Sequence, residues 1–355
     1  MIRVLLLGAG NIGNAIAGLL STSGDYHVTV AELDQSRISG LAENVYTKRM
    51  DVADDHSLWE AMRGKDVVVS ACPFDLSVPI AEAARDLSVH YFDLTEDVET
   101  ARRVREIADG ADTAFMPQCG LAPGFVSIAA YELVKRFDSL RRVRMRVGAL
   151  PLFPSNALKY NLTWSTAGLI NEYCNPCEVI YDGELREVLP LEGYEQFSLD
   201  GVTYEAFNTS GGLGTLCETL KGKVDNLNYK TIRYPGHCEL IKFMCNDLRL
   251  GKRRELFQDV LEHAVPVTTQ DVVLIFITVS GGKGEKLVQE SYSKNVYHGK
   301  VGHLELAAIQ ITTAAALCAV VDLQCKGKLP RKGFVKQEEV SLESFLENRF
   351  GRHYR

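Results

Sequence analysis

The sequence predicts an α/β fold in which a doubly wound parallel sheet carries an inserted α+β domain. Strand-like and helix-like segments alternate over residues 1–125, and this alternation implies right-handed βαβ crossovers. A glycine-rich turn separates the first strand-like segment from the first helix-like one. After residue 125 the segments become long and alternate apolar with polar residues, which favours a mainly antiparallel sheet.

The first domain is expected to contain strands at residues 3–7, 27–31, 45–50, 66–71, 90–93 and 113–116. Helices are expected between them at residues 11–21, 35–41, 54–62, 78–87 and 98–110. Further helices are expected at residues 123–136, 236–248 and 302–326, the last of them apolar on most sides and therefore buried. Residues 1–125 and 305–355 are predicted to form one domain, and residues 126–304 the inserted one.

The glycine-rich turn has the spacing Gly8-x-Gly10-x-x-Gly13. Glycine adopts left-handed backbone conformations without steric cost, and the unpaired N–H groups of a helix N-terminus bind phosphate. The first strand-to-helix turn of a doubly wound sheet is where dinucleotide folds bind pyrophosphate. The turn, with Asn11 and Ile12, is therefore predicted to bind a cofactor in a Rossmann domain.

A carboxylate ends the second strand at Glu32, nineteen positions after Gly13. A carboxylate about 20 residues after the glycines accepts the ribose hydroxyls and repels a 2′-phosphate, so NAD is expected and NADP is disfavoured. Asp34 is an alternative for the same role. Ligands of α/β sheets bind at the carboxyl ends of the strands. The further candidate cofactor contacts there are Asp51, Val52, Ser70, Ala71, Pro73 and Gln118.

Composition argues against several other classes of partner. The net charge of −7 disfavours binding to nucleic acid or to an anionic membrane, and the arginine-rich run 141–146 fits one solvated face of a strand. The longest apolar stretch, residues 304–323, contains polar and acidic residues, so no membrane span is predicted. With no leader pattern ahead of the first strand, a cytoplasmic location is expected.

Nine scattered cysteines fit a reducing compartment better than a disulfide framework. Cys174 and Cys177 have C-x-x-C spacing, but a zinc site would need two further ligands and no second pair follows. No metal site is expected, and the two cysteines are predicted to be structural.

Four motifs follow the glycine turn: C-G-L-A-P-G at residues 119–124, T-W-S at 163–165, S-G-G-L at 210–213 and Y-P-G-H at 234–237. With these motifs the sequence resembles the saccharopine dehydrogenase-like family, and most closely its L-lysine 6-dehydrogenase branch. The resemblance implies a nicotinamide dinucleotide in the Rossmann domain and an amino-acid substrate beside the α+β domain. It also implies oxidation of an amine at the end of a side chain, and a homodimer.

One departure from the family bears on the substrate. Family members that form glutamate have an aspartate before the proline of the sixth-strand turn, where this sequence has Ala122. The departure disfavours saccharopine and favours L-lysine. The implied reaction is hydride loss from the ε-carbon, hydrolysis to α-aminoadipate semialdehyde with release of ammonia, and cyclisation to piperideine-6-carboxylate.

Two alternatives to lysine oxidation remain open. A saccharopine dehydrogenase or reductase would need a second cation for its larger substrate, for which Lys159 is the nearby candidate. A non-catalytic dinucleotide sensor would need no side chains of the second domain around the nicotinamide.

The substrate carboxylate is expected to pair with Arg233, because a guanidinium binds a carboxylate bidentately. Backbone N–H groups from Thr209 onward could contribute to the same contact. Tyr160, Thr163 and Trp164 are the other candidate substrate contacts, with the two aromatic rings lining the aliphatic chain. A structural salt bridge for the arginine and core packing for the rings are the alternatives.

Two residues are candidates for the proton acceptor. His237 has a suitable ordinary pKa of about 6.5, and Glu96 follows a strand at the edge where α/β sheets place ligand contacts. A structural histidine and a helix-starting glutamate are the alternatives.

Overall fold

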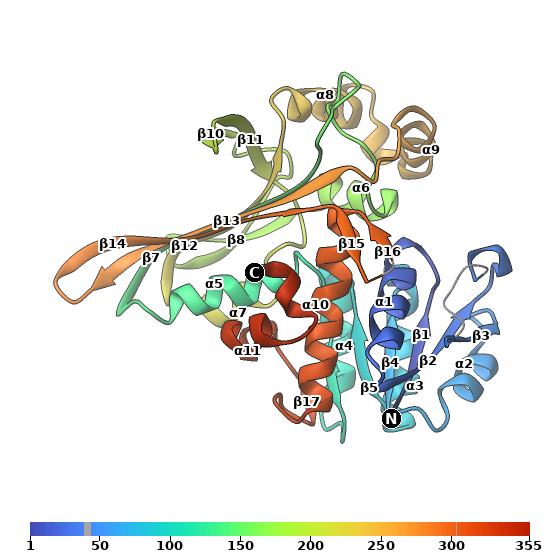
Figure 1. The fold of residues 1–355 in the computed structure, drawn as a ribbon. Helices are drawn as coiled ribbons and strands as arrows, with labels where there is room; N and C mark the ends of the chain where they lie inside the picture. The colour runs from blue at the N-terminus through green and yellow to red at the C-terminus, as the bar shows by residue number, and fades with distance from the viewer. Residues whose placement is uncertain (39–43, 303) are drawn as a thin grey trace. The chain divides into compact units, whose positions relative to one another are not determined.

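The computed structural model describes residues 1–38, 44–302 and 304–355, and the chain forms two compact units (Figure 1). Unit 1 comprises Met1–Phe125, Val301–Leu304 and Gln310–Arg355. Unit 2 comprises Val126–Lys300 and Glu305–Ile309.

Unit 1 is built on a seven-stranded sheet of order β17-β6-β5-β4-β1-β2-β3. Every pair is parallel, and the strand order reverses next to β1, so the expected doubly wound Rossmann sheet is confirmed. The strands are β1 (Ile2–Leu7), β2 (Tyr26–Glu32), β3 (Tyr46–Arg49), β4 (Val67–Ser70), β5 (His90–Asp93), β6 (Ala114–Met116) and β17 (Gly333–Phe334). β4 is fully buried and β1 is buried from Val4 to Leu7, as parallel strands covered on both faces must be.

Helices connect these strands: α1 (Asn11–Thr22), α2 (Asp55–Met62), α3 (Ser77–Asp86) and α4 (Val98–Ala108). Carboxylates cap two of them. Asp54 accepts a hydrogen bond from the Ser57 amide at the start of α2, and Asp97 accepts one from the Thr100 amide at the start of α4. The helix expected at residues 35–41 is a short 3-10 turn, Gln35–Arg37, in its described part. Residues 39–41 of that prediction lie outside the described residues.

The C-terminal segment returns to unit 1 through α10 (Ala308–Cys325) and α11 (Leu342–Glu347). Asp322 of α10 is buried and accepts hydrogen bonds from the Tyr26 hydroxyl (2.8 Å), the Arg349 guanidinium (2.6 Å) and the Asn348 amide (2.8 Å). A single carboxylate thus joins β2 to the residues after α11.

Helix α10 begins later than expected because Leu304–Leu306 (β16) pairs with Gly299–Val301 (β15) in a short ribbon. Among the described residues it is the one helix long and apolar enough to cross a membrane. Its 18 residues are 83% buried within the protein, which is the property of a core helix.

Unit 2 is built on an eight-stranded sheet with the path β10-β11-β12-β7-β13-β14. Off this path, β8 pairs with β12, and β9 pairs with β8. Its strands are β7 (Ser139–Pro151), β8 (Cys177–Tyr181), β9 (Glu184–Val188), β10 (Glu195–Leu199), β11 (Val202–Asn208), β12 (Val224–Arg233), β13 (Asp271–Lys283) and β14 (Lys286–Tyr297). The β7–β12 pair is parallel and the other pairs are antiparallel, so the sheet is mixed. Figure 1 shows β13 and β14 as a long orange hairpin.

The helices of unit 2 include α5 (Phe125–Val134, whose first residue belongs to unit 1), α6 (Thr166–Cys174), α7 (Leu216–Leu220), α8 (His237–Lys242) and α9 (Arg254–Ala264). The helix expected at residues 236–248 is present as α8 followed by a π-helical turn, Phe243–Asp247.

The arginine-rich start of β7 is only partly solvated. Arg141, Arg142 and Arg144 are exposed, as expected, but Arg146 is 4% exposed and the expectation is wrong there. Its guanidinium forms an ion pair with Glu195 of β10, which also binds the Lys230 ammonium at 2.8 Å. The distant strand β10 therefore supplies the carboxylate that makes this burial possible.

Replacing Asp322 by alanine is expected to lower the free energy of unfolding by about 3 kcal/mol. The substitution removes the buried carboxylate to which Tyr26, Asn348 and Arg349 donate hydrogen bonds. Burial opposes ionisation of Asp322, but hydrogen bonds from Lys326 and Tyr26, among others, lower its pKa overall. The stabilisation is therefore present at neutral pH and disappears as the pH falls below about 4.

Urea unfolding followed by circular dichroism at several pH values would measure both effects. Asp25→Ala is the matched control, because it removes the exposed carboxylate that also contacts Arg349 and should cost less than about 1 kcal/mol. An equal loss in the two variants would contradict the role given to Asp322.

Candidate active site

Two glycines of the turn after β1 are required by the fold itself. Gly8 has a φ of +94°, and a Cβ on it would lie 2.8 Å from the Ala71 carbonyl oxygen at the end of β4. A Cβ on Gly13 would lie 2.1 Å from the Gly8 carbonyl oxygen. Helix α1 can therefore approach β1 and β4 closely only with these residues.

Gly10 is different, because nothing in the protein requires a glycine there. Its φ is −69°, which any residue can adopt, and a Cβ would meet no atom within 4 Å. It is the N-cap of α1 and provides no side-chain hydrogen bond to the first N–H groups of the helix. Open space above unsatisfied N–H groups fits the approach of a pyrophosphate.

The carboxylate of Glu32 is fixed at the same turn. Its Oε2 accepts a hydrogen bond from the Ala9 amide at 2.7 Å, and its Oε1 accepts from the amides of Leu33 and Asp34 at 2.9 and 3.0 Å. The Asp34 carboxylate instead accepts from the amide and hydroxyl of Ser36. Of the two candidates, Glu32 is therefore the one that borders the glycine turn.

The remaining candidate cofactor contacts of β3 and β4 lie at the carboxyl ends of these strands. Asp51 is exposed and accepts from the Ala53 amide, whereas Val52 is buried. Ser70 is buried, and its hydroxyl makes no hydrogen bond of good geometry with the described residues. Ala71 lies against Gly8 and Gly13 of the glycine turn, and Pro73 precedes the 3-10 turn Phe74–Leu76. That these residues contact a cofactor stays a prediction.

Gln118 is held in a left-handed conformation, with a φ of +64°, at the end of β6. Its amide donates to Oδ1 of the buried Asp93, which also accepts from the Thr95 amide at 3.0 Å. The hydroxyl of Tyr91 donates to the other oxygen at 2.6 Å. Asp93, which sequence analysis missed, thereby fixes both Gln118 and the loop that carries the half-buried Glu96.

In unit 2, Arg233 is 3% exposed at the end of β12. Its Nε donates to the Tyr173 hydroxyl at 3.1 Å, and its Nη1 donates to the Thr231 hydroxyl at 2.8 Å and the Ile232 carbonyl at 2.9 Å. Its guanidinium carbon lies 4.8 Å from the ring centre of Tyr160. Within the part of the chain that the structure describes, no carboxylate forms an ion pair with it, although the charge of the buried Glu172 acts on it from farther away.

The carboxylate nearest in register does not serve Arg233. Glu205 of β11 is paired directly with Arg233 in the sheet and is also buried. Its two oxygens accept from the amides of Gly236 and Cys238, at 2.7 and 2.6 Å, at the N-terminus of α8. Glu205 therefore satisfies the first turn of α8, and the salt-bridge alternative for Arg233 finds no support.

His237, the first residue of α8, is 1% exposed and both its ring nitrogens have partners. Nδ1 lies 2.8 Å from the Leu158 carbonyl oxygen, and Nε2 lies 2.9 Å from the Tyr173 hydroxyl. Burial, and then the charge of Arg233, lower the pKa of His237 to about 3. The imidazole is therefore neutral at physiological pH.

Several buried polar groups of unit 2, among them Tyr160 beside Arg233, make no hydrogen bond of good geometry in the described part of the chain. The hydroxyl of Tyr160 and that of Thr163 make no hydrogen bond of good geometry with the described residues, and neither do Asn161 Oδ1 and the Thr209 hydroxyl. Burial raises the pKa of Tyr160, so its hydroxyl stays protonated. Trp164 is half-buried on the same loop. Unsatisfied buried polar atoms are costly, and a polar ligand would satisfy them.

Lys159, the candidate second cation, is exposed and has a φ of +49°. Its ammonium donates to the Pro235 carbonyl oxygen at 2.9 Å. Cys174 and Cys177 are free thiols, and the described residues contain no group of three or more potential metal ligands of the Cys, His, Asp and Glu types.

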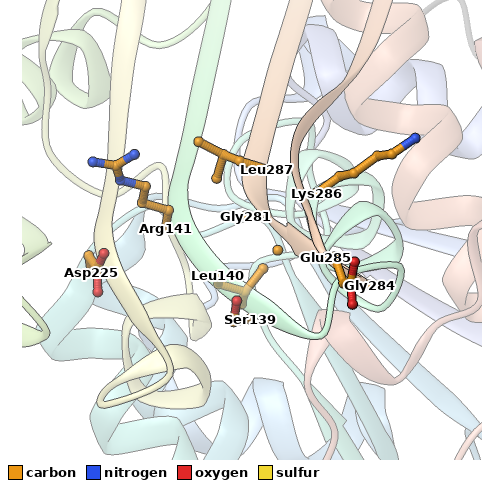
Figure 2. Close-up of a pocket in the computed structure, with 10 residues that line it drawn as sticks. Ser139, Leu140, Arg141, Asp225, Gly281, Gly284, Glu285, Lys286 and Leu287 are labelled. Atoms are coloured by element: carbon orange, nitrogen blue, oxygen red, sulfur yellow. The ribbon is translucent and has the colours of Figure 1, made fainter.

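A shallow pocket of about 460 Å³ lies at the far end of the unit 2 sheet (Figure 2). Figure 2 shows Arg141 and Asp225 beside one another and Glu285 and Lys286 near the β13–β14 turn. None of the sequence-predicted site residues lines it.

Two family models together match most of the chain. The model described as "Saccharopine dehydrogenase NADP binding domain" matches residues 4–116, and that described as "Saccharopine dehydrogenase C-terminal domain" matches residues 120–349. The chain belongs to the saccharopine dehydrogenase family. The resemblance to this family inferred from the short motifs is thereby confirmed, and the closer likeness to its L-lysine 6-dehydrogenase branch stays a prediction.

Curated relatives of this saccharopine dehydrogenase family member are about a fifth to a quarter identical to it over the aligned residues. Mitochondrial alpha-aminoadipic semialdehyde synthase of Rattus norvegicus is 21% identical over 316 residues, which cover 82% of this chain and 33% of that protein. Saccharopine dehydrogenase (NADP(+), L-glutamate-forming) of Saccharomyces cerevisiae is 26% identical over 257 residues, covering 68% and 56%. The chain thus spans only about a third to a half of these relatives.

Solved structures support the fold over nearly the whole chain. Apo saccharopine dehydrogenase (L-Glu forming) from Saccharomyces cerevisiae has a TM-score of 0.79 at 17% identity, covering 98% of this chain and 97% of that one. Homospermidine synthase from Legionella pneumophila, in complex with NAD, has a TM-score of 0.68 at 12% identity. The match covers 99% of this chain and 89% of that one. At these identities the likeness shows the fold alone.

Replacing Gly10 by valine is expected to abolish dinucleotide binding while leaving the fold intact. A Cβ at this position meets no protein atom within 4 Å, but the valine side chain would fill the space through which a pyrophosphate would approach the N-terminus of α1. Calorimetric titration with NAD and thermal unfolding would measure the two effects. Gly13→Val is the control, because it should destabilise the fold itself, and micromolar NAD affinity in Gly10→Val would show that the turn binds no phosphate.

Proposed function

We propose that the protein is an NAD-dependent oxidoreductase of the saccharopine dehydrogenase family that oxidises the ε-amine of L-lysine. The products would be α-aminoadipate semialdehyde, which cyclises to piperideine-6-carboxylate, and ammonia. The observation that carries the proposal is the buried Arg233, which has no carboxylate partner in residues 1–38, 44–302 or 304–355. A buried unpaired cation is costly, and the α-carboxylate of an amino acid would compensate it.

The supply of cations favours a substrate with one carboxylate at this site. Arg146 and Lys230, the neighbouring buried cations, bind Glu195. Lys159 is exposed, and its ammonium donates one of its three N–H groups to the Pro235 carbonyl. Saccharopine, with more carboxylates than lysine, would need this exposed cation in addition to Arg233.

Saccharopine oxidation is the second candidate, because the yeast relative named above carries that activity in its name and its solved counterpart matches the fold over nearly the whole chain. At the position of Ala122 the glutamate-forming family members have an aspartate. This difference favours lysine as the substrate.

The cofactor is proposed to be NAD, held by the turn from Gly8 to Gly13 and by Glu32. The fit rests on the open space at Gly10 and on a carboxylate already fixed beside the turn, which would accept ribose hydroxyls and repel a 2′-phosphate. The name of the matching family model specifies NADP, so the preference for NAD over NADP is a proposal that goes beyond the family match. When bound, the nicotinamide ring supplies the hydride acceptor.

The protein's own residues would bind and deprotonate the substrate. Arg233 would hold the α-carboxylate, while Tyr160 and Trp164 would contact the aliphatic chain and the Thr163 hydroxyl a polar group. Glu96 is the proposed proton acceptor for the ε-ammonium, since hydride can leave only from the neutral amine. Water then adds to the imine, which releases ammonia and leaves the aldehyde. Homodimerisation stays a prediction.

Replacing Arg233 by alanine is expected to reduce kcat/KM for L-lysine at least about 30-fold, because a desolvated charged contact is worth about 2–5 kcal/mol. The loss should fall mainly on KM, since the carboxylate is bound in both the ground and transition states. Initial rates of NADH formation would measure it, with cadaverine, which has no carboxylate, as the control substrate. Equal losses for lysine and cadaverine would show that Arg233 is structural.

Replacing Glu32 by alanine is expected to narrow the preference for NAD over NADP, because the variant no longer repels a 2′-phosphate. The ratio of kcat/KM for the two cofactors would report the change. Asp34→Ala is the matched control and should leave the ratio nearly unchanged. Equal use of both cofactors by the unmodified protein would overturn the assignment of Glu32.

A further inference from the structure

We propose that Tyr173 and His237 are positioning residues: a neutral hydrogen-bond chain from Leu158 to Arg233 orients the guanidinium so that Nη2 alone faces the substrate carboxylate. The inference rests on the proposed function for the identity of the ligand. It assigns His237 to orienting Arg233 and leaves proton transfer to another group.

The donor and the acceptor in each of these hydrogen bonds follow from the groups at the two ends, the Leu158 carbonyl and the Arg233 guanidinium. The Leu158 carbonyl can only accept, so His237 Nδ1 at 2.8 Å carries a hydrogen. In the neutral ring Nε2 then lacks one, so it accepts from the Tyr173 hydroxyl at 2.9 Å. The Tyr173 oxygen, whose hydrogen is committed, accepts from Arg233 Nε at 3.1 Å.

The chain leaves the guanidinium with one free end. A guanidinium has five N–H groups. One is used by Tyr173, and Nη1 donates to the Thr231 hydroxyl and the Ile232 carbonyl. Both hydrogens of Nη2 remain, because the structure describes no partner for them. A carboxylate would therefore bind at Nη2, and the fork-like bidentate pairing expected from sequence would require Nη1 or Nε to give up a partner.

The surrounding charges keep the chain neutral. His237 faces Arg233 from β12, Tyr173 from α6 and Tyr160 from the preceding loop. The charge of Glu172 acts on Arg233, and Glu205 binds the backbone at the start of α8. A protonated His237 would place a second positive charge against Arg233 and would turn its Nε2 from acceptor into donor. Two donors would then meet on the Tyr173 oxygen, so the arrangement requires a neutral ring.

The kinetic test compares Tyr173→Phe, His237→Leu and His237→Gln with L-lysine and cadaverine as substrates. Tyr173→Phe and His237→Leu should raise KM for lysine about tenfold with kcat within about threefold, since each removes a hydrogen bond in a chain ending on a charged group. His237→Gln, whose amide oxygen can accept from Tyr173, should recover part of the loss. Cadaverine turnover should change less than about twofold in all three variants. Loss of kcat for both substrates in His237→Gln would show that His237 transfers the proton and would overturn the inference.

A second measurement does not depend on lysine. In protein labelled with ¹⁵N-histidine, the ring signals that disappear in His237→Gln should show a neutral ring protonated at Nδ1, unchanged between about pH 5 and 8. Tyr173→Phe should shift the Nε2 signal. Titration near pH 6.5, or protonation at Nε2, overturns the chain even if lysine is oxidised. If the spectrum is as expected but the protein oxidises no amine, the proposed function is overturned and the hydrogen-bond chain from Leu158 to Arg233 is still supported.

Discussion

The buried charge of Arg233 is the constraint on which the arrangement of unit 2 depends. Burying a guanidinium without a counter-ion is unfavourable unless its N–H groups are satisfied, and Tyr173, Thr231 and a carbonyl satisfy three of them with neutral oxygens. The carboxylate beside it in the sheet, Glu205, is committed to the N-terminus of α8. That commitment also fixes His237, which reaches back through Tyr173 to the same guanidinium. The protein thus orients the cation with neutral oxygens, and no carboxylate among the described residues forms an ion pair with it.

Unit 1 shows the same separation between what the fold needs and what a ligand needs. Gly8 and Gly13 are demanded by close contacts between β1, β4 and α1, whereas Gly10 is demanded by no protein atom. Asp93 is likewise structural, because its carboxylate is fully engaged in joining the ends of β5 and β6. Functional candidates in both units are therefore recognisable as groups whose identity packing does not explain.

Much of the fold was predictable because its signals are local. The strands of unit 1 and most helices follow from apolar periodicity and capping residues, and the glycine spacing places the cofactor turn. Features that depend on distant partners were not predictable. The parallel pairing of β7 with β12 and the burial of Arg146 depend on strands far along the chain. The tautomer of His237 depends on Leu158 and Tyr173, which are 79 and 64 positions away, and a lone histidine in a Pro-Gly-His turn gives no signal of either.

The pairing of β17 with β6 has a consequence for how the chain folds during synthesis. Gly333 completes the sheet beside Ala114, so β6 remains an open edge until the ribosome has made the whole of the intervening unit 2. An unpaired parallel edge exposes backbone groups to mispairing, and closing so long a loop slows folding. Unit 2 has nearly all of its residues available earlier, because its main segment ends at Lys300. The nascent chain is therefore most vulnerable to aggregation in the interval before α10 and β17 emerge.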